Sequence, residues 1–192
     1  MIGEKFTLMQ YSISAILGLI EAEDFVIPEI QRPFVWNRSQ VRDLIDSLYS
    51  GYPTGYIITW KNPDVQTKDG GKANGKILID GKQRITSLMA AISGKEVLDE
   101  DFNKDRIKIA FNPLATDETK RFAVQDASHL KNKKWIPDIS VVFDSNFDPF
   151  DFALKYCEDN ESIKPNDINK AITALKGIAN RQIGVIELDH SL

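Results

Sequence analysis

The sequence has few of the residues that build metal and redox sites. It contains one cysteine, Cys157, and two histidines, His129 and His190, in 192 residues. A single cysteine excludes a disulfide within the chain and a zinc site built from cysteines. The two histidines lie far apart and form no His-Asn-His pattern typical of a nuclease. We expect Cys157 to be a reduced, partly buried thiol on a helix.

Long apolar runs and an excess of positive charge are also lacking. No stretch approaches the roughly 18 consecutive apolar residues that a membrane span needs, and the N-terminus does not have the form of a signal peptide. We therefore expect a cytoplasmic protein with no membrane partner. The formal net charge of −4 provides no overall basic surface for nucleic acid, although a local basic patch stays possible.

The length of the chain indicates one domain with a hydrophobic core. We treat residues 1–192 as a single domain, in which residues 25–99 form the motif-bearing core and residues 100–192 continue it. A strand predicted over residues 183–188 ends close to Leu192. We therefore expect the chain to be the N-terminal fragment of a longer protein.

Helical and extended patterns alternate along the sequence. Strands are predicted over residues 6–10, 25–27, 56–60, 77–80, 107–111, 121–125, 139–143 and 183–188. Helices are predicted over residues 13–20, 41–49, 85–92, 150–156 and 168–178. The predicted helix caps are Ser12, Asn37 with Gln40 three residues later, and Asn166 or Asp167. This mixture indicates an α/β (α+β) fold, a small mixed sheet flanked by helices, with an exposed and mobile loop over residues 61–76.

One segment imitates a phosphate-binding loop. Residues 70–76, Gly-Gly-Lys-Ala-Asn-Gly-Lys, match the first seven positions of the P-loop pattern. Ile77 then stands where Ser or Thr should hold the metal. A P-loop also follows a strand and opens a helix, whereas this segment follows a polar loop and leads into a strand. We therefore interpret it as a loop.

Residues 77–88, Ile-Leu-Ile-Asp-Gly-Lys-Gln-Arg-Ile-Thr-Ser-Leu, join a predicted strand to a predicted helix through Gly81. Such a junction directs backbone N–H groups and the positive end of the helix dipole toward one spot. The side chains of Lys82, Gln83 and Arg84 can all donate to a phosphate. The stretch predicts an anion site. The structural alternative is that Asp80 caps the helix and Arg84 pairs with a surface carboxylate.

A second cluster, residues 27–36, has the sequence Ile-Pro-Glu-Ile-Gln-Arg-Pro-Phe-Val-Trp. Two prolines stiffen the backbone around Gln31 and Arg32. An arginine fork, a glutamine amide and the nearby ring of Trp36 suit a planar phosphorylated ligand such as a nucleotide. For Phe34 and Val35 we favour a place in the core.

In their order and spacing, the two clusters resemble the N-terminal domain of GmrSD-type, modification-dependent restriction endonucleases, a large bacterial family. The resemblance covers residues 25–91 well and is loose beyond residue 99. It implies a ParB/sulfiredoxin-like fold in which the strand-turn-helix arginine motif binds nucleotide phosphates. It also implies binding or hydrolysis of a nucleoside triphosphate, coupled to restriction of modified foreign DNA.

The family motif usually has the sequence Asp-Gly-Gln-Gln-Arg. The resemblance implies catalytic roles for Asp80, Gln83 and Arg84, with Asp80 holding Mg²⁺ or orienting water, and Gln83 orienting the water or the nucleobase. Asp80 as a plain helix cap stays open. The implied nucleotide-binding residues are Gln31, Arg32, Gly81, Lys82 and Thr86. Lys82 stands where Gln is usual, which keeps a donor and loses an acceptor. Binding is therefore favoured more clearly than hydrolysis.

Two other functions stay open. The chain could be a DNA-binding module in which Arg32 and Arg84 contact DNA phosphates or a modified base, or an inactive scaffold for assembly. The segment around His129 has basic neighbours, and it forms either a weak nucleic-acid patch or, as the overall acidity favours, a solvated loop. In the family the nuclease centre lies in a C-terminal domain. The expected partners are therefore a nucleotide, DNA in the full-length protein, and a C-terminal nuclease domain or partner subunit.

Overall fold

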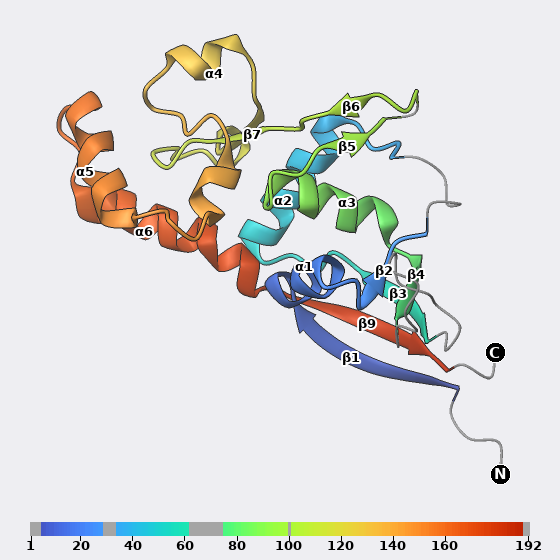
Figure 1. Ribbon diagram of the computed structural model, residues 1–192. Helices are drawn as coiled ribbons and strands as arrows, with labels where there is room; N and C mark the ends of the chain where they lie inside the picture. The colour runs from blue at the N-terminus through green and yellow to red at the C-terminus, as the bar shows by residue number, and fades with distance from the viewer. Residues whose placement is uncertain (1–4, 29–33, 62–74, 100, 190–192) are drawn as a thin grey trace.

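The largest sheet in the described part of the chain is a five-stranded mixed sheet, which lies at one side of the molecule (Figure 1). The computed structural model describes residues 5–28, 34–61, 75–99 and 101–189. The strands of this sheet are β1 (Phe6–Ser12), β2 (Phe25–Val26), β3 (Tyr56–Lys61), β4 (Lys76–Asp80) and β9 (Gln182–Leu188). Their order is β1-β9-β3-β4-β2, with antiparallel pairs β1–β9 and β3–β4 and parallel pairs β9–β3 and β4–β2. Each of the five corresponds to a predicted strand, and the predicted α+β class with a mixed sheet is confirmed.

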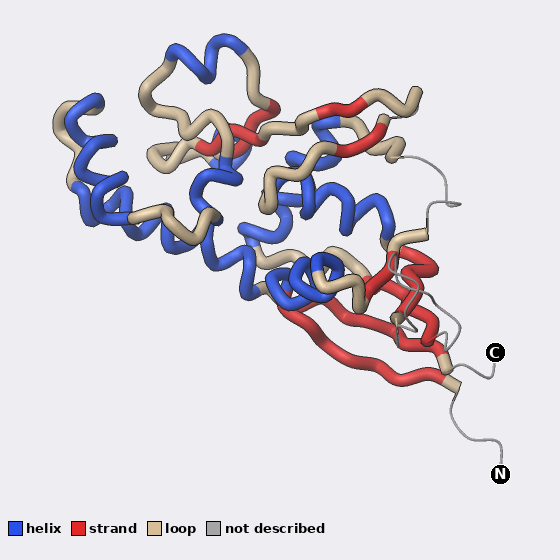
Figure 2. The backbone as a smooth tube through the Cα atoms, in the orientation of Figure 1, coloured by secondary structure: helices blue, strands red, loops and turns tan. Residues whose placement is uncertain are grey.

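Three helices lie on the same side of the sheet, and the first of them packs directly on it (Figures 1 and 2). They are α1 (Ile13–Glu21), α2 (Arg38–Ser50) and α3 (Lys82–Ala91). Each buries the face that its apolar spacing predicts, as Ile13 and Ile16 do in α1. Alternate strand residues such as Ile57 and Leu78 are buried as well. The helices and the sheet thus share a core.

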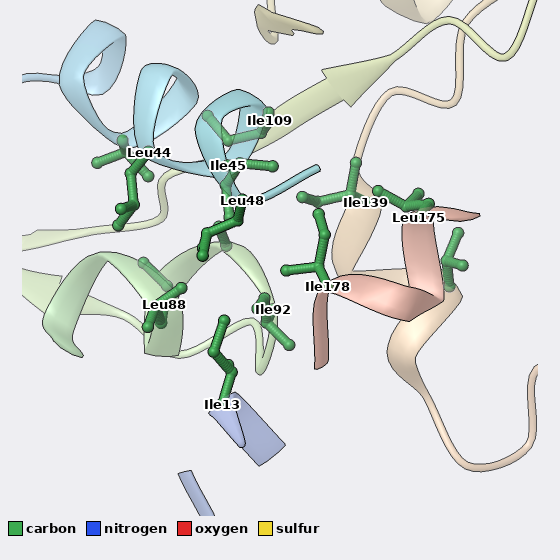
Figure 3. Packing of buried hydrophobic residues seen from close by; sticks show 14 of the residues in the cluster. Ile13, Leu44, Ile45, Leu48, Leu88, Ile92, Ile109, Ile139, Leu175 and Ile178 are labelled. Carbon is green, nitrogen blue, oxygen red and sulfur yellow. The ribbon is translucent and has the colours of Figure 1, made fainter. Parts of the chain in front are cut away.

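The rest of the chain adds short strands and further helices. These elements are β5 (Val97–Leu98), β6 (Lys104–Asp105), β7 (Ile109–Phe111), η1 (Glu118–Lys120), β8 (Phe122–Val124), α4 (Ala127–Lys131), η2 (Ile139–Phe143), α5 (Pro149–Asp159), α6 (Pro165–Lys176) and η3 (Gly177–Asn180). Helices α5 and α6 extend to the side away from β2 and β4 (Figure 1). One apolar cluster runs from Ile13 through α2 and α3 to Leu175 and Ile178 (Figure 3). Both parts of the chain therefore contribute to the same core.

The strand predicted over residues 139–143 is wrong, because this segment forms the 3₁₀ helix η2. The side chain of Asp138 caps it by accepting a hydrogen bond from the Ser140 backbone N–H at 3.0 Å. Ile139 and Val142, three residues apart, are both fully buried. Three residues make one turn of a 3₁₀ helix, so a single turn buries both side chains. The cap and the core override the β propensity of Ile and Val.

The cap predicted for α6 is also wrong. Lys164 is the N-cap and Pro165 is the first helical residue, so Asn166 and Asp167 already lie inside the helix. Proline suits the first helical position because its missing N–H would have no partner within the helix there. The predicted helix face that contains Ile168 and Ile172 is buried as expected.

The segment around His129 forms the short helix α4 and is not the solvated loop that we favoured. His129 is 13% exposed, and its Nδ1 accepts a hydrogen bond from the Asp126 backbone N–H while its ring packs edge-on against Trp135. Hydrogen bonds from the Ser128 hydroxyl and the His129 backbone N–H lower the pKa of Asp126 to about 2. The polar groups here cap the helix.

Helix α2 begins with the capping box that the sequence predicts. The Asn37 side chain accepts from the Gln40 backbone N–H, and the Gln40 side chain accepts from the Asn37 N–H, both at 2.9 Å. We expect Asn37→Ala to lower the free energy of unfolding by about 1 kcal/mol, measured by urea denaturation. Asn166→Ala is the matched control, since Asn166 is exposed within α6 and caps nothing, and equal losses from both would contradict the assignment.

Candidate functional site

The site begins where β4 passes into α3 through Gly81 (Figure 1). Gly81 has φ +99° and is itself the N-cap, so the proposed capping of α3 by Asp80 is wrong. A Cβ atom on Gly81 would lie 2.5 Å from Cγ2 of Ile57 on β3. Left-handed backbone and lack of space both require glycine. The tight turn brings the N-terminus of α3, with its positive dipole end, directly beside the end of β4.

A hollow of about 380 Å³ opens at this turn. The residues that line it are Trp36, Ile79, Asp80, Gly81, Lys82, Gln83 and Arg84. The fold thus brings Trp36 of the second cluster to five consecutive residues of the motif. The half-buried Thr86 lies further along α3 and is not among the lining residues. The predicted binding residues Gln31 and Arg32 lie outside the described residues.

Arg84 is held in place from two sides. Its Nη1 donates to the backbone oxygen of Thr54 at 2.8 Å, and its Nη2 lies 3.3 Å from Oδ2 of Asp80. The guanidinium also passes over Gly55, where a Cβ would lie 2.6 Å from Nη1. Arg84 therefore does pair with a surface carboxylate, as the structural alternative proposed, and that carboxylate is Asp80.

The Arg84–Asp80 pair leaves both side chains able to take part in binding. Asp80 is 65% exposed, whereas Arg84 is 19% exposed. An ion pair with such an exposed partner contributes little to stability, so an incoming phosphate can compete with Asp80 for the guanidinium. The planar fork of Arg84 matches two phosphate oxygens. Arg84 is accordingly the best placed cation for an anion in this hollow.

Lys82 adds a second positive charge to the site. Burial lowers the pKa of Lys82, because the ammonium loses part of its hydration. An anion beside the ammonium acts in the opposite direction and raises the pKa. Of the described residues that line the hollow, Lys82 and Arg84 are cationic and Asp80 is anionic. The local balance therefore favours an anion, in contrast to the net charge of the chain.

Gln83 is 7% exposed and connects the two clusters. Its Oε1 accepts hydrogen bonds from the backbone N–H groups of Val35 at 3.0 Å and Trp36 at 3.2 Å. Phe34 is buried in the core as predicted, whereas the core prediction for Val35 is wrong, since Val35 is 37% exposed. The sequence did not predict the hydrogen bonds from Val35 and Trp36 to Gln83. It also did not predict that the Thr54 carbonyl holds Arg84, since Thr54 only follows a turn-rich stretch after α2.

The side chains at the hollow supply only some of the ligands that a magnesium ion needs. Within the described ranges, no three His, Cys, Asp or Glu side chains gather into a possible metal site. At the hollow, Asp80 is the carboxylate present. Mg²⁺ is commonly bound by one or two carboxylates together with substrate phosphates. Asp80 fits this pattern when a phosphorylated ligand supplies the other oxygens.

The fold and site define an α+β domain with a cationic strand-turn-helix hollow. The family model described as "GmrSD restriction endonuclease, N-terminal domain" matches residues 13–191. The chain belongs to this family, which connects it with DNA restriction. The match also includes the region beyond residue 99. A search of curated proteins finds no match. Across the described parts of the chain, every helix is too short or too polar to cross a membrane.

Proposed function

We propose that this domain binds a nucleoside triphosphate in the hollow at the start of α3 and hydrolyses it in support of the restriction of modified foreign DNA. One observation carries the proposal: the motif residues 80–84 surround a hollow of about 380 Å³, with Lys82 and Arg84 beside a helix N-terminus. Helix N-termini with adjacent cations are suited to phosphate. The volume lies within the usual range for small-ligand sites.

Different residues of the hollow bind different parts of the nucleotide. Arg84, fixed by Thr54, binds phosphate oxygens through its fork, and Lys82 adds a point charge. Trp36 offers an aromatic face on which a nucleobase can stack. The further assignments of Gln31, Arg32 and Thr86 depend on the family resemblance, as does the ParB/sulfiredoxin-like fold.

Asp80 is the residue that would hold a magnesium ion in this proposal. When bound, the ion supplies charge neutralisation on the phosphate oxygens. A phosphate that draws Arg84 toward itself leaves the exposed Asp80 carboxylate able to accept a hydrogen bond from water. Asp80 is therefore also our candidate for orienting the water that hydrolysis requires.

Titration calorimetry tests the proposal directly. Each of the four ribonucleoside triphosphates is titrated into the protein with Mg²⁺, and phosphate release is measured in parallel. We expect saturable binding of at least one triphosphate. No heat with any of the four would contradict the proposal. Binding without phosphate release would restrict it to a nucleotide-binding domain.

Membership of a restriction endonuclease family also supports a second candidate, in which the same cations contact DNA. Binding through phosphate contacts would weaken steeply as salt rises. Gel-shift titrations over a salt series, with modified and unmodified duplexes, separate the candidates. DNA binding that depends on modification and is lost in Arg84→Ala, without any triphosphate binding, would favour this candidate. In either case we assign DNA cleavage to a C-terminal domain or partner subunit.

We expect Lys82→Gln, which restores the usual family residue, to weaken triphosphate binding by about tenfold, since one charge-assisted contact is lost. In the wild-type protein, affinity should fall as pH rises through the lowered pKa of Lys82, because only the ammonium attracts phosphate. The variant should lack this part of the pH dependence. Calorimetry over a pH series, with the exposed Lys131→Gln as control, measures both effects. An unchanged pH profile would remove Lys82 from the site.

A further inference from the structure

Gln83 occupies an unusual place for a polar side chain. It lies in the first turn of α3 and is 7% exposed. Its side chain reaches the backbone of a segment 47 and 48 residues earlier, at Trp36 and Val35. Because both partners are N–H donors, the atom between them must be the amide oxygen. Two hydrogen bonds, at 3.0 and 3.2 Å, engage this oxygen.

The segment that donates these hydrogen bonds has no regular structure of its own. Residues 34–37 belong to no helix or strand and lead directly into α2. Two consecutive backbone N–H groups that converge on one side-chain oxygen both have a hydrogen-bond partner outside their own segment. The backbone at Val35 and Trp36 is therefore fixed to the first turn of α3, and the buried Phe34 provides a further anchor in the core.

The position of Trp36 depends on this attachment. Trp36 borders the hollow at the start of α3, and it also borders a second hollow of about 310 Å³ that Arg84 shares. A shift of the Trp36 backbone would change both. The Ser87 hydroxyl donates to the backbone oxygen of Gln83 at 2.8 Å within the same helix. The backbone of Trp36 is thus tied to the first turn of α3.

We infer that Gln83 is a positioning residue, which holds Trp36 at the edge of the anion site so that the indole can receive the base of a nucleotide. The inference rests on the proposed function. Gln83 acts by positioning Trp36 and does not itself act on the reacting atoms. It also assigns base recognition to Trp36 and phosphate recognition to Lys82 and Arg84.

Amide hydrogen exchange tests the attachment without any ligand. Gln83→Met keeps the length of the side chain and removes the acceptor, whereas Gln83→Glu keeps an acceptor oxygen. We expect exchange at Val35 and Trp36 to become about tenfold faster in Gln83→Met and to stay near wild type in Gln83→Glu, in keeping with the loss of one hydrogen-bonding group. Gln10→Met, exposed on β1, is the matched control. Unchanged exchange in Gln83→Met would overturn the inference.

A shorter variant, Gln83→Asn, keeps the test decisive if Gln83→Met does not fold. Its amide cannot reach both N–H groups, so the same faster exchange at Val35 and Trp36 is expected. Exchange in β3 and β4 should remain slow in all variants that fold. Slow exchange at Val35 and Trp36 in Gln83→Asn would count against the attachment.

Ligand binding then tests the consequence. We expect Gln83→Met to bind a ribonucleoside triphosphate about tenfold more weakly and inorganic tripolyphosphate almost as well as wild type, since only the base contacts Trp36. Equal losses for both ligands, or no loss for either, would overturn the role through Trp36. Failure of the wild-type protein to bind either ligand would instead overturn the proposed function, while the exchange comparison would still decide whether Gln83 holds the segment.

Discussion

Replacing Arg84 with alanine is expected to weaken triphosphate binding by at least about a hundredfold, as measured by titration calorimetry with Mg²⁺. The guanidinium is fixed by the Thr54 carbonyl at 2.8 Å, so its fork is already oriented before a ligand arrives. Losing two charge-assisted hydrogen bonds from a preorganised group removes most of the affinity of a phosphate site. The ion pair with the largely exposed Asp80 should contribute little to stability, whereas loss of the hydrogen bond to the Thr54 carbonyl should lower the free energy of unfolding by about 1.5–3 kcal/mol.

Two variants separate geometry from charge in this experiment. Arg84→Lys keeps the charge and loses the fork, so an intermediate affinity is expected. Arg42→Ala is the control for removing an arginine elsewhere, since Arg42 pairs with the exposed Asp43 on α2. Equal losses in Arg84→Ala and Arg42→Ala would show a general effect of charge. Full affinity in an Arg84→Ala protein that thermal unfolding shows to be folded would remove this hollow as the nucleotide site.

Replacing Gly81 with alanine is expected to lower the free energy of unfolding by about 3 kcal/mol, measured by urea denaturation, with loss of ligand binding. Two effects add. The backbone at φ +99° is strained for any residue with a side chain, and the new Cβ would lie 2.5 Å from Cγ2 of Ile57. Ile57 is completely buried in β3, so it has no room to move away. Relief of the contact must shift the start of α3 and hence the site.

Gly18 provides the matched control for this substitution. It lies in α1, and a Cβ at this position would meet no atom within 4 Å. Gly18→Ala should therefore raise stability by about 0.5–1 kcal/mol, since alanine restricts the unfolded chain and favours the helix. A Gly81→Ala protein as stable as Gly18→Ala would show that the turn between β4 and α3 can relax, and would contradict its role in placing the site.

Sequence reasoning succeeded where short-range physics decides the structure. The capping box of Asn37 and Gln40 needs only two residues three positions apart and a following apolar face. The β4–Gly81–α3 turn is similar, because strand, glycine and helix follow one another directly. The first residue of a helix is harder to predict when several candidate caps lie within a few residues of each other. Lys164 and Pro165 begin α6 in place of the predicted Asn166 or Asp167, since proline suits the first helical position.

The errors and omissions lie where packing decides. The segment from Ile139 to Phe143 has a strand-like composition, but Asp138 and the core select a 3₁₀ turn. His129 is flanked by polar residues typical of a loop, yet it completes a cap and packs on Trp135. In both segments, the local sequence allows more than one backbone conformation of similar energy. Tertiary contacts then determine which conformation forms.

The candidate site shows the same division. The sequence by itself determined that a strand-glycine-helix turn with donor side chains lies at Asp80–Arg84, the turn that we propose as the anion site, because backbone amides, the helix dipole and donor side chains all follow from a local pattern. Only the tertiary structure decided what surrounds that turn. Thr54 orients Arg84, and Gln83 binds Val35 and Trp36 across the fold. These partners are separated by long stretches of chain, and the packing of α3 beside α2 and the sheet brings them within hydrogen-bonding distance.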